Sequence, residues 1–152
     1  MVVVDRLSKY AHFIPLSHPF TVQTVTQAFI DNVLKLHGPT LAIVSDRDRN
    51  FTSQMWQDIF KGMGTELRYS SSYHAKSDGQ TGRVNQCIKN YLQCLSSTKP
   101  KQWAKHLSMA EYWYNTSYQS SLKKKPFEVA YGFPPPNICE NILPDSMTVV
   151  AL

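Results

Sequence analysis

The sequence has few cysteines and no long hydrophobic run, and each scarcity excludes a class of protein. The three cysteines, Cys87, Cys94 and Cys139, form no C-x-x-C pair, and an odd number argues against a disulfide scaffold or a zinc site. The longest apolar runs, MVVV and VVAL, lie at the two ends, whereas a membrane-spanning helix needs about 20 apolar residues. Asp5 and Arg6 interrupt the first run, so we expect no signal peptide. These features predict reduced thiols, no membrane span, and a nuclear or cytoplasmic location.

The chain is short and basic. Its 152 residues, 42% of them apolar, suffice for one domain with its own core. Lys and Arg number 16 against 11 Asp and Glu, which gives a net charge of +5. Such a surplus favours a polyanionic partner such as nucleic acid without identifying one. We expect a folded domain over residues 1–134 and an extended tail over residues 135–152.

Hydrophobic periodicity predicts a mixed α/β fold. Strand patterns are found in a pair of short segments within residues 2–16, and in residues 41–46 and 65–71. Helical patterns are found in residues 21–38, with Thr21 as cap and Gly38 as stop, and in residues 52–64, about 80–96, 101–119 and 126–132. This order of elements predicts a mixed sheet with helices on both faces.

Two aspartates follow predicted strands. Asp5 ends the first strand, and Asp46 ends the run LAIVSD. Side chains at strand ends leave the core and converge in a crevice of such sheets. Two carboxylates there would suit Mg²⁺, which takes oxygen ligands and supports phosphoryl transfer. Aspartates also commonly begin turns, so these residues alone leave both interpretations open.

Four segments carry a recognisable pattern: VVVDRLSKYAHFIPL, LHGPTLAIVSDRDRNFTSQMWQDIF, YHAKSDGQTGRVNQCIKNYL and EYWYNTSYQSSLKKKPFEVAYG. Together they closely resemble the integrase catalytic core of plant gypsy-type long-terminal-repeat retrotransposons, from about residue 2 to residue 134. The resemblance implies a ribonuclease H-like fold with a five-stranded mixed sheet flanked by helices. It also implies DNA integration by strand transfer, with Mg²⁺ or Mn²⁺ as cofactor.

The resemblance implies an active site of two aspartates and one glutamate. The aspartates match Asp5, which would bridge two ions, and Asp46, which would hold one of them. The third position, with 35 residues between it and Asp46, falls at Gly82, where the family pattern reads DGQTE. Ala75 also departs from the family's YHP. We therefore expect weak or single-ion binding, and strand transfer that is lost or reduced by several orders of magnitude.

Two nearby carboxylates are poor substitutes for the missing glutamate. Asp78 lies in an expected loop, KSDGQ, and Asp48 would crowd the site of Asp46. Three functions stay open: a DNA-binding integrase core with impaired catalysis, an active polynucleotidyl transferase with a substitute ligand, and a domesticated non-enzymatic module that binds a protein. Whether Gly82 arose by decay, domestication or a deliberate change also stays open. Glycine in a first helical turn costs up to about 1 kcal/mol relative to alanine, so the fold should survive.

Polar residues around position 82 are the candidate nucleic-acid contacts. Asn85, Gln86 and Lys89 follow it by three, four and seven residues, so they share its side of the predicted helix. A solvated helix face would explain the same pattern. With the residues that border the site by resemblance, the candidate set is His74, Lys76, Gln80, Arg83, Asn85, Gln86 and Lys89. DNA bound there should be released steeply by salt.

An aromatic stripe follows on the next predicted helix. It consists of Trp103, Tyr112, Trp113, Tyr114 and Tyr118. Such a stripe is more typical of a core or a subunit interface than of a platform for bases. The resembling integrases self-associate through helices of this region, so a homodimer is expected.

Overall fold

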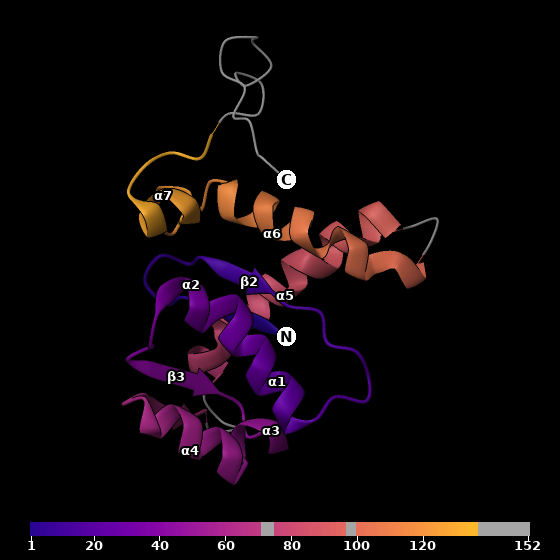
Figure 1. The fold of residues 1–152 in the computed structure, drawn as a ribbon. Helices are drawn as coiled ribbons and strands as arrows, with labels where there is room; N and C mark the ends of the chain where they lie inside the picture. The colour runs from indigo at the N-terminus through magenta and orange to yellow at the C-terminus, as the bar shows by residue number, and fades with distance from the viewer. Residues whose placement is uncertain (71–74, 97–99, 137–152) are drawn as a thin grey trace, which may run out of the picture.

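The structure is a computed structural model that describes residues 1–70, 75–96 and 100–136, with the backbone alone at 75–81, 94–96 and 100–102. Four strands are present in this part of the chain: β1 (Val2–Val4), β2 (Ala11–Phe13), β3 (Ala42–Ser45) and β4 (Glu66–Tyr69). The helical elements are α1 (Val22–Phe29), η1 (Ile30–Leu34), α2 (Lys35–His37), α3 (Arg49–Thr52), α4 (Gln54–Gly62), α5 (Ala75–Ser96), η2 (Pro100–His106), α6 (Leu107–Thr116) and α7 (Pro126–Tyr131) (Figure 1). Most of the predicted tail, residues 137–152, lies outside the described residues.

The strands form two short ladders. β1 pairs antiparallel with β2, with Val3 opposite His12. β3 pairs parallel with β4, with Ile43 opposite Leu67. Within the described ranges no strand joins the two ladders, so the predicted five-stranded mixed sheet is not found there.

Side chains of α6 occupy the outer edge of β2, and no further strand in the described ranges pairs with it. The buried Asn115 side chain accepts a hydrogen bond from the Ala11 N–H (2.9 Å) and donates one to the Ala11 carbonyl (2.8 Å). The Glu111 carboxylate accepts from the N–H of Phe13 (2.8 Å). Buried backbone groups need such partners, and here α6 supplies them in place of a strand.

Helices cover both faces of the β1–β2 ladder, as predicted. Side chains alternate along a strand, so Val2 and Val4 contact one core and Val3 contacts the other. The first core is built from β2, α5 and α6: Ala11, Phe13, Val84, Ile88, Leu107, Ala110 and Tyr114. The second is built mainly from α1, η1 and α4: Ile14, Val25, Phe29, Val33, Trp56 and Phe60. Ile43 and Leu67 of the second ladder also pack on the second core.

The first long helix has the predicted ends and an unpredicted middle. The Thr21 hydroxyl accepts from the N–H of Thr24, and the Thr24 hydroxyl accepts from the N–H of Thr21, which forms a capping box. Gly38 ends the helical segment at φ +75°, a conformation that glycine adopts without strain. Between these ends lies the π-helical turn η1, which widens the helix and is invisible to a search for a period of 3.6 residues.

The helix predicted over residues 52–64 is confirmed as α4, and a separate short helix, α3, precedes it. Ser53 between them is extended, and its hydroxyl caps α4 by accepting from the N–H of Trp56. The segment 101–119 becomes the 3-10 helix η2 followed by α6. The short helix predicted after residue 125 is confirmed as α7, with Pro126 in its first turn.

The helix predicted to begin near residue 80 begins at Ala75 instead. The expected loop AKSDGQ is therefore helical, and Asp78 lies in the same helix as Gly82, one turn before it. Gly82 is in the interior of α5 and not in its first turn, so its cost relative to alanine approaches about 1 kcal/mol.

In the described part of the chain no helix is long and apolar enough to cross a membrane.

Candidate functional site

Asp5 lies exposed, directly after β1, in the turn that leads to β2. Its carboxylate accepts hydrogen bonds from the N–H of Ser8 (2.7 Å) and from the Ser8 hydroxyl, and Ser8 itself is buried. Partial burial raises the pKa of the Asp5 carboxyl, but the Ser8 hydrogen bonds, an N–H of Leu7 and the charge of Lys9 outweigh burial and leave the pKa below its ordinary value. The carboxylate is therefore ionised at neutral pH and held in a fixed orientation.

Asp46 lies exposed after β3, and its carboxylate accepts from the N–H of Asp48 (3.1 Å). The Asp48 carboxylate caps α3 by accepting from the backbone and side-chain N–H groups of Asn50 (2.9 and 2.7 Å). Asp48 is thus used locally as a helix cap, which is a further reason to expect a poor substitute ligand.

Gly82 lies exposed on α5. A Cβ atom built at this position would meet no other atom within 4 Å, so a larger side chain would extend into open space. Among the residues that the structure describes, no three His, Cys, Asp or Glu side chains converge to hold a metal ion. The oxygen donors of Asp5 and Asp46 match the preference of Mg²⁺, but they are only two protein carboxylates.

Four of the predicted nucleic-acid contacts form an exposed polar surface on α5: Arg83, Asn85, Gln86 and Lys89. The Gln86 amide donates to the side-chain oxygen of Asn90 (3.0 Å), one turn along the helix. Lys76 and Gln80 belong to the same helix, but their side chains lie outside the described residues, as does all of His74. The exposure of this helix face is confirmed, and nucleic-acid binding by it stays a prediction.

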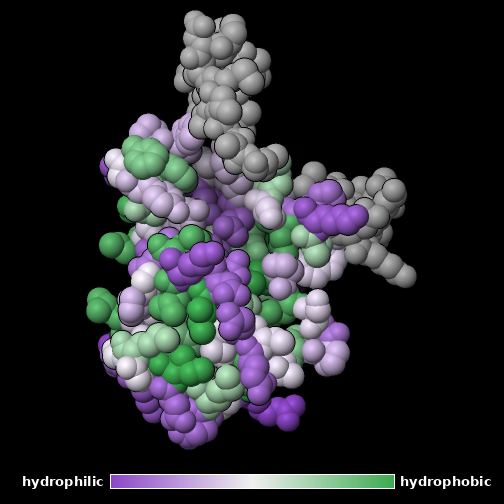
Figure 2. Space-filling view, in the orientation of Figure 1, coloured by the Kyte–Doolittle hydropathy of each residue, from purple (hydrophilic) through white to green (hydrophobic). Residues whose placement is uncertain are grey.

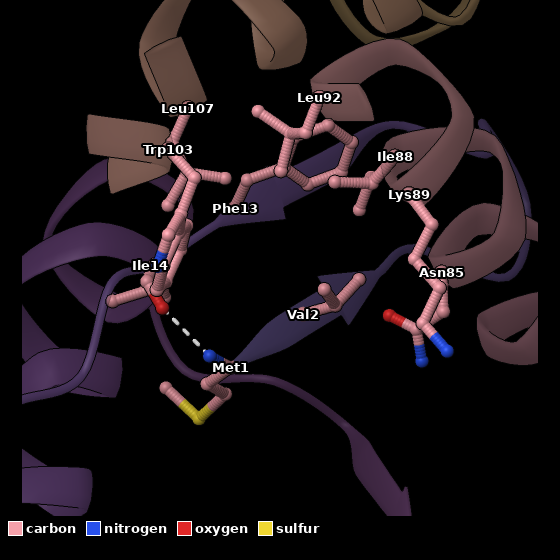
Figure 3. Close-up of a pocket in the computed structure, with 10 residues that line it drawn as sticks. All are labelled: Met1, Val2, Phe13, Ile14, Asn85, Ile88, Lys89, Leu92, Trp103 and Leu107. Carbon is pink, nitrogen blue, oxygen red and sulfur yellow. Dashed lines mark hydrogen bonds between the residues drawn. The ribbon is translucent and has the colours of Figure 1, made fainter. Parts of the chain in front are cut away.

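Asn85 and Lys89 also line a shallow pocket of about 230 Å³ between α5, η2 and the β1–β2 ladder. Figure 3 shows apolar side chains around most of the pocket, with the Asn85 amide and Lys89 at one side. At the opposite side the Met1 amine donates to the carbonyl of Ile14 (2.6 Å). Figure 3 also shows β1 running from Met1 toward the side on which Asn85 lies. Val4, the last residue of β1 before Asp5, packs on the same core as Val84, which lies two residues after Gly82.

The aromatic stripe divides between core and surface. Tyr114 is buried, and its ring packs on that of Phe13 with centroids 5.7 Å apart. The Trp113 ring is stacked on Tyr91 at 4.9 Å, yet Trp113 remains 41% exposed. The other exposed members are Trp103, Tyr112 and Tyr118. Tyr114 therefore belongs to the core, and for the four exposed members the interface alternative stays a prediction.

No protein-family model matches the chain. Over 134 residues, or 88% of its length, the chain is 34% identical to the Tf2-3 and Tf2-4 transposon polyproteins of Schizosaccharomyces pombe. It spans 10% of the length of these curated relatives.

Solved structures of viral integrases are similar to the chain. The catalytic core domain of HTLV-2 integrase in complex with magnesium aligns with a TM-score of 0.69 at 21% identity, over 84% of this chain and 81% of that one. The simian T-cell lymphotropic virus intasome, in complex with the PP2A regulatory subunit B56 gamma, aligns with a TM-score of 0.76 at 18% identity, over 99% of this chain and 52% of that one. The chain has the fold of an integrase catalytic core. The integrase-like ribonuclease H fold expected from the sequence is confirmed, and the narrower resemblance to plant gypsy-type elements stays a prediction.

One cluster in this integrase-core fold has no counterpart in the sequence analysis. His12, His37 and Glu111 form a chain of hydrogen bonds that joins β2, α2 and α6. His12 occupies a strand position between Ala11 and Phe13, and its partners are 25 and 99 residues away. Periodicity reports only local neighbours, so the sequence carries no signal for this cluster.

Proposed function

We propose that the chain is the catalytic-core domain of a retrotransposon integrase that retains DNA binding but has impaired strand transfer. One observation carries this proposal: in an integrase-core fold, two exposed aspartates follow β1 and β3, and the position that should supply the third carboxylate is Gly82. The packing of β1 against α5 supports the assignment, because Val4, next to Asp5, contacts the core that includes Val84 of α5.

Asp5 and Asp46 would hold the cofactor, Mg²⁺ or Mn²⁺. A bound ion of this kind would activate an attacking water or 3′-hydroxyl and stabilise the leaving oxygen. The Ser8 hydrogen bonds keep the Asp5 carboxylate charged and oriented for this role. Gly82 contributes neither a charge nor a ligand, so we infer that one ion binds at most weakly and a second is not retained. The magnesium complex of the HTLV-2 integrase core supports the choice of metal.

DNA is the proposed partner, and the exposed face of α5 is the proposed contact. Arg83 and Lys89 would neutralise phosphates, while Asn85 and Gln86 would donate hydrogen bonds to the backbone or to base edges. The net charge of +5 adds a long-range attraction for the same partner. A DNA partner favours the nucleus as the site of action.

A homodimer is proposed through the exposed apolar face of α6. Met109 is 59% exposed, Tyr112 37% and Trp113 41%, and the three lie within about one turn of the helix. Exposed aromatic and methionine side chains of this kind are enriched at interfaces. Solved HTLV-2 integrase cores exist in dimeric and trimeric forms, which supports self-association.

A second candidate is an active polynucleotidyl transferase that uses Asp78 in place of the glutamate. The early start of α5 favours this candidate, because it puts Asp78 on the same side of the same helix as position 82, one turn away. The third candidate, a non-enzymatic module with a protein partner, predicts no salt-dependent affinity for DNA.

Binding to a labelled DNA duplex, measured by fluorescence anisotropy at salt concentrations from about 50 mM to about 200 mM, tests the proposal. We expect the affinity to fall steeply over this range. In Lys89→Ala the slope of log affinity against log salt concentration should be smaller in magnitude by about one. Lys61→Ala, which removes one exposed charge from α4, is the matched control and should bind like the unmodified chain. A lack of salt-dependent binding would reject the DNA-binding proposal and favour the third candidate.

A further inference from the structure

A buried imidazole lies at the centre of the chain of hydrogen bonds between β2, α2 and α6. His12 is only 7% exposed. Its Nδ1 lies 3.2 Å from a Glu111 carboxylate oxygen, and its Nε2 lies 2.8 Å from the Nε2 of His37 at the end of α2. The other Glu111 oxygen accepts from the N–H of Phe13. The cluster thus ties the β1–β2 ladder both to α6 and to the helical segment that leads into β3.

The two rings are aligned for a hydrogen bond rather than for a metal ion. Their centroids are 5.1 Å apart and their Nε2 atoms 2.8 Å apart, a difference of 2.3 Å. This difference is about twice the distance from the centre of an imidazole ring to its nitrogen, so the two Nε2 atoms point almost straight at each other. An ion between them would need about 2.0–2.1 Å to each nitrogen, which the 2.8 Å gap does not allow.

The alignment fixes the number of protons that the pair can hold. A carboxylate only accepts, so the Nδ1 of His12 carries the hydrogen that faces Glu111. The contact with His37 then needs one hydrogen between the two Nε2 atoms, donated by either ring. A first added proton can sit on the Nδ1 of His37 and leaves this contact intact, whereas a second would place an N–H on both sides of the 2.8 Å contact, where neither nitrogen could accept. The contact is therefore incompatible with two fully protonated rings.

The surroundings also oppose protonation of His37. Partial burial lowers the pKa of His37, the neighbouring His12 lowers it further, and the charge of Asp5 opposes both, so the pKa lies below its ordinary value of 6.5. Asp5 and His37 both lie in the part of the chain that the structure describes, and no hydrogen bond or ion pair joins them. Tyr10 packs against both imidazole rings and against Tyr131 of α7. Burial, Tyr131 and the charge of Glu111 raise the pKa of Tyr10, so it stays neutral.

We propose that His12 and His37 form a proton-sensitive latch that holds the end of α2 against β2 and opens when both imidazoles become protonated. Above pH 6.5 the latch is closed and contributes its full stabilisation. As the pH falls below 6.5, the unfolded chain takes up protons more readily than the folded chain, so the free energy of unfolding decreases. The two ladders share no backbone pairing in the described ranges, so the latch is a polar tie between β2, the strand that follows the Asp5 turn, and the segment that leads into β3 and Asp46. The proposal does not depend on integrase activity.

Urea unfolding of the full chain, followed from about pH 7.5 to about pH 5, tests the latch. His37→Gln keeps an N–H donor for His12 but takes up no proton, and His106→Gln removes one imidazole from outside the cluster. We expect the unmodified chain and His106→Gln to lose stability on acidification by the same amount, and His37→Gln to lose clearly less. Equal pH dependence in all three chains would overturn the proposal.

A second measurement covers the case in which a variant does not fold. Long-range ¹⁵N–¹H correlation spectra of the unmodified chain report which ring nitrogens carry hydrogen. Near pH 7.5 we expect a protonated Nδ1 on His12 and a single hydrogen shared between the two Nε2 atoms. Amide shifts of residues 35–38 should then change together with the second protonation. Two rings that titrate with no change at these amides would contradict the latch.

Discussion

The two ladders of this fold are held in different ways. The buried Asn115 and the partly buried Glu111 of α6 fix the β1–β2 ladder by direct hydrogen bonds to its backbone, and the His12 chain adds a further tie. The β3–β4 ladder has a different support: the backbone pairing of its own strands and the packing of Ile43 and Leu67 on the second core. Asp5 therefore follows the more heavily anchored ladder, and Asp46 the one supported chiefly by apolar contacts. The proposed metal site would therefore combine one strongly held carboxylate and one less strongly held.

Asn115→Ala should cause the largest loss of stability, because it removes the main anchor of the β1–β2 ladder. The change removes both hydrogen bonds to Ala11 and leaves a buried N–H and a buried carbonyl without a partner. Each such group costs about 1–3 kcal/mol, so we expect a loss of about 4 kcal/mol in the free energy of unfolding, measured with urea. Thr116→Ala, which removes a hydrogen bond to the Tyr112 carbonyl on the exposed side of α6, is the control and should cost far less. Similar losses in the two variants would contradict the role of Asn115.

Glu111→Gln should have the next largest effect. Glutamine keeps one side-chain oxygen but loses the negative charge that strengthens the hydrogen bonds from His12 and Phe13. We expect a loss of about 1–2 kcal/mol in the free energy of unfolding near neutral pH. Glu128→Gln on α7 is the matched control for charge. An unchanged unfolding midpoint in Glu111→Gln would show that the carboxylate does not anchor β2.

Gly82→Ala should stabilise the chain. The added methyl group meets open space, and alanine replaces glycine inside a helix. The expected gain is about 0.5–1 kcal/mol, read from the same urea titration. A loss of stability would mean that α5 is not regular at this position.

Arg68→Ala should have the smallest effect. The guanidinium makes an ion pair of 2.7 Å with Glu66 on β4, but both side chains are exposed to water. Solvent screens such pairs, so the unfolding midpoint should not change measurably. A clear destabilisation would show that the β3–β4 ladder depends on a surface ion pair rather than on apolar packing.

The sequence predicts the features that depend on local pattern. The cap at Thr21, the stop at Gly38, the position of α7 and the two strand-end aspartates all follow from residue type and spacing. The resemblance adds the integrase-like fold and identifies Gly82 as the departure.

Features that depend on distant contacts were not predictable in this way. A five-stranded sheet is expected, but at the outer edge of β2 Asn115 and Glu111, about 100 residues away in the sequence, take the backbone hydrogen bonds. The partnership of His12 with His37 depends on tertiary packing in the same way. The early start of α5 shows the opposite case, in which helical structure continues through a glycine-containing segment that reads as a loop.

Strand transfer by the unmodified chain and by Gly82→Glu, assayed side by side with Mg²⁺ and with Mn²⁺, tests the central claim most directly. The open space beside position 82 should accept the glutamate without displacing its neighbours. We predict that Gly82→Glu gains activity by several orders of magnitude over the unmodified chain, because it restores the third carboxylate of the metal site. The double variant Gly82→Glu, Asp46→Asn should lose the gain. Equal and substantial activity in the unmodified chain and in Gly82→Glu would contradict the account.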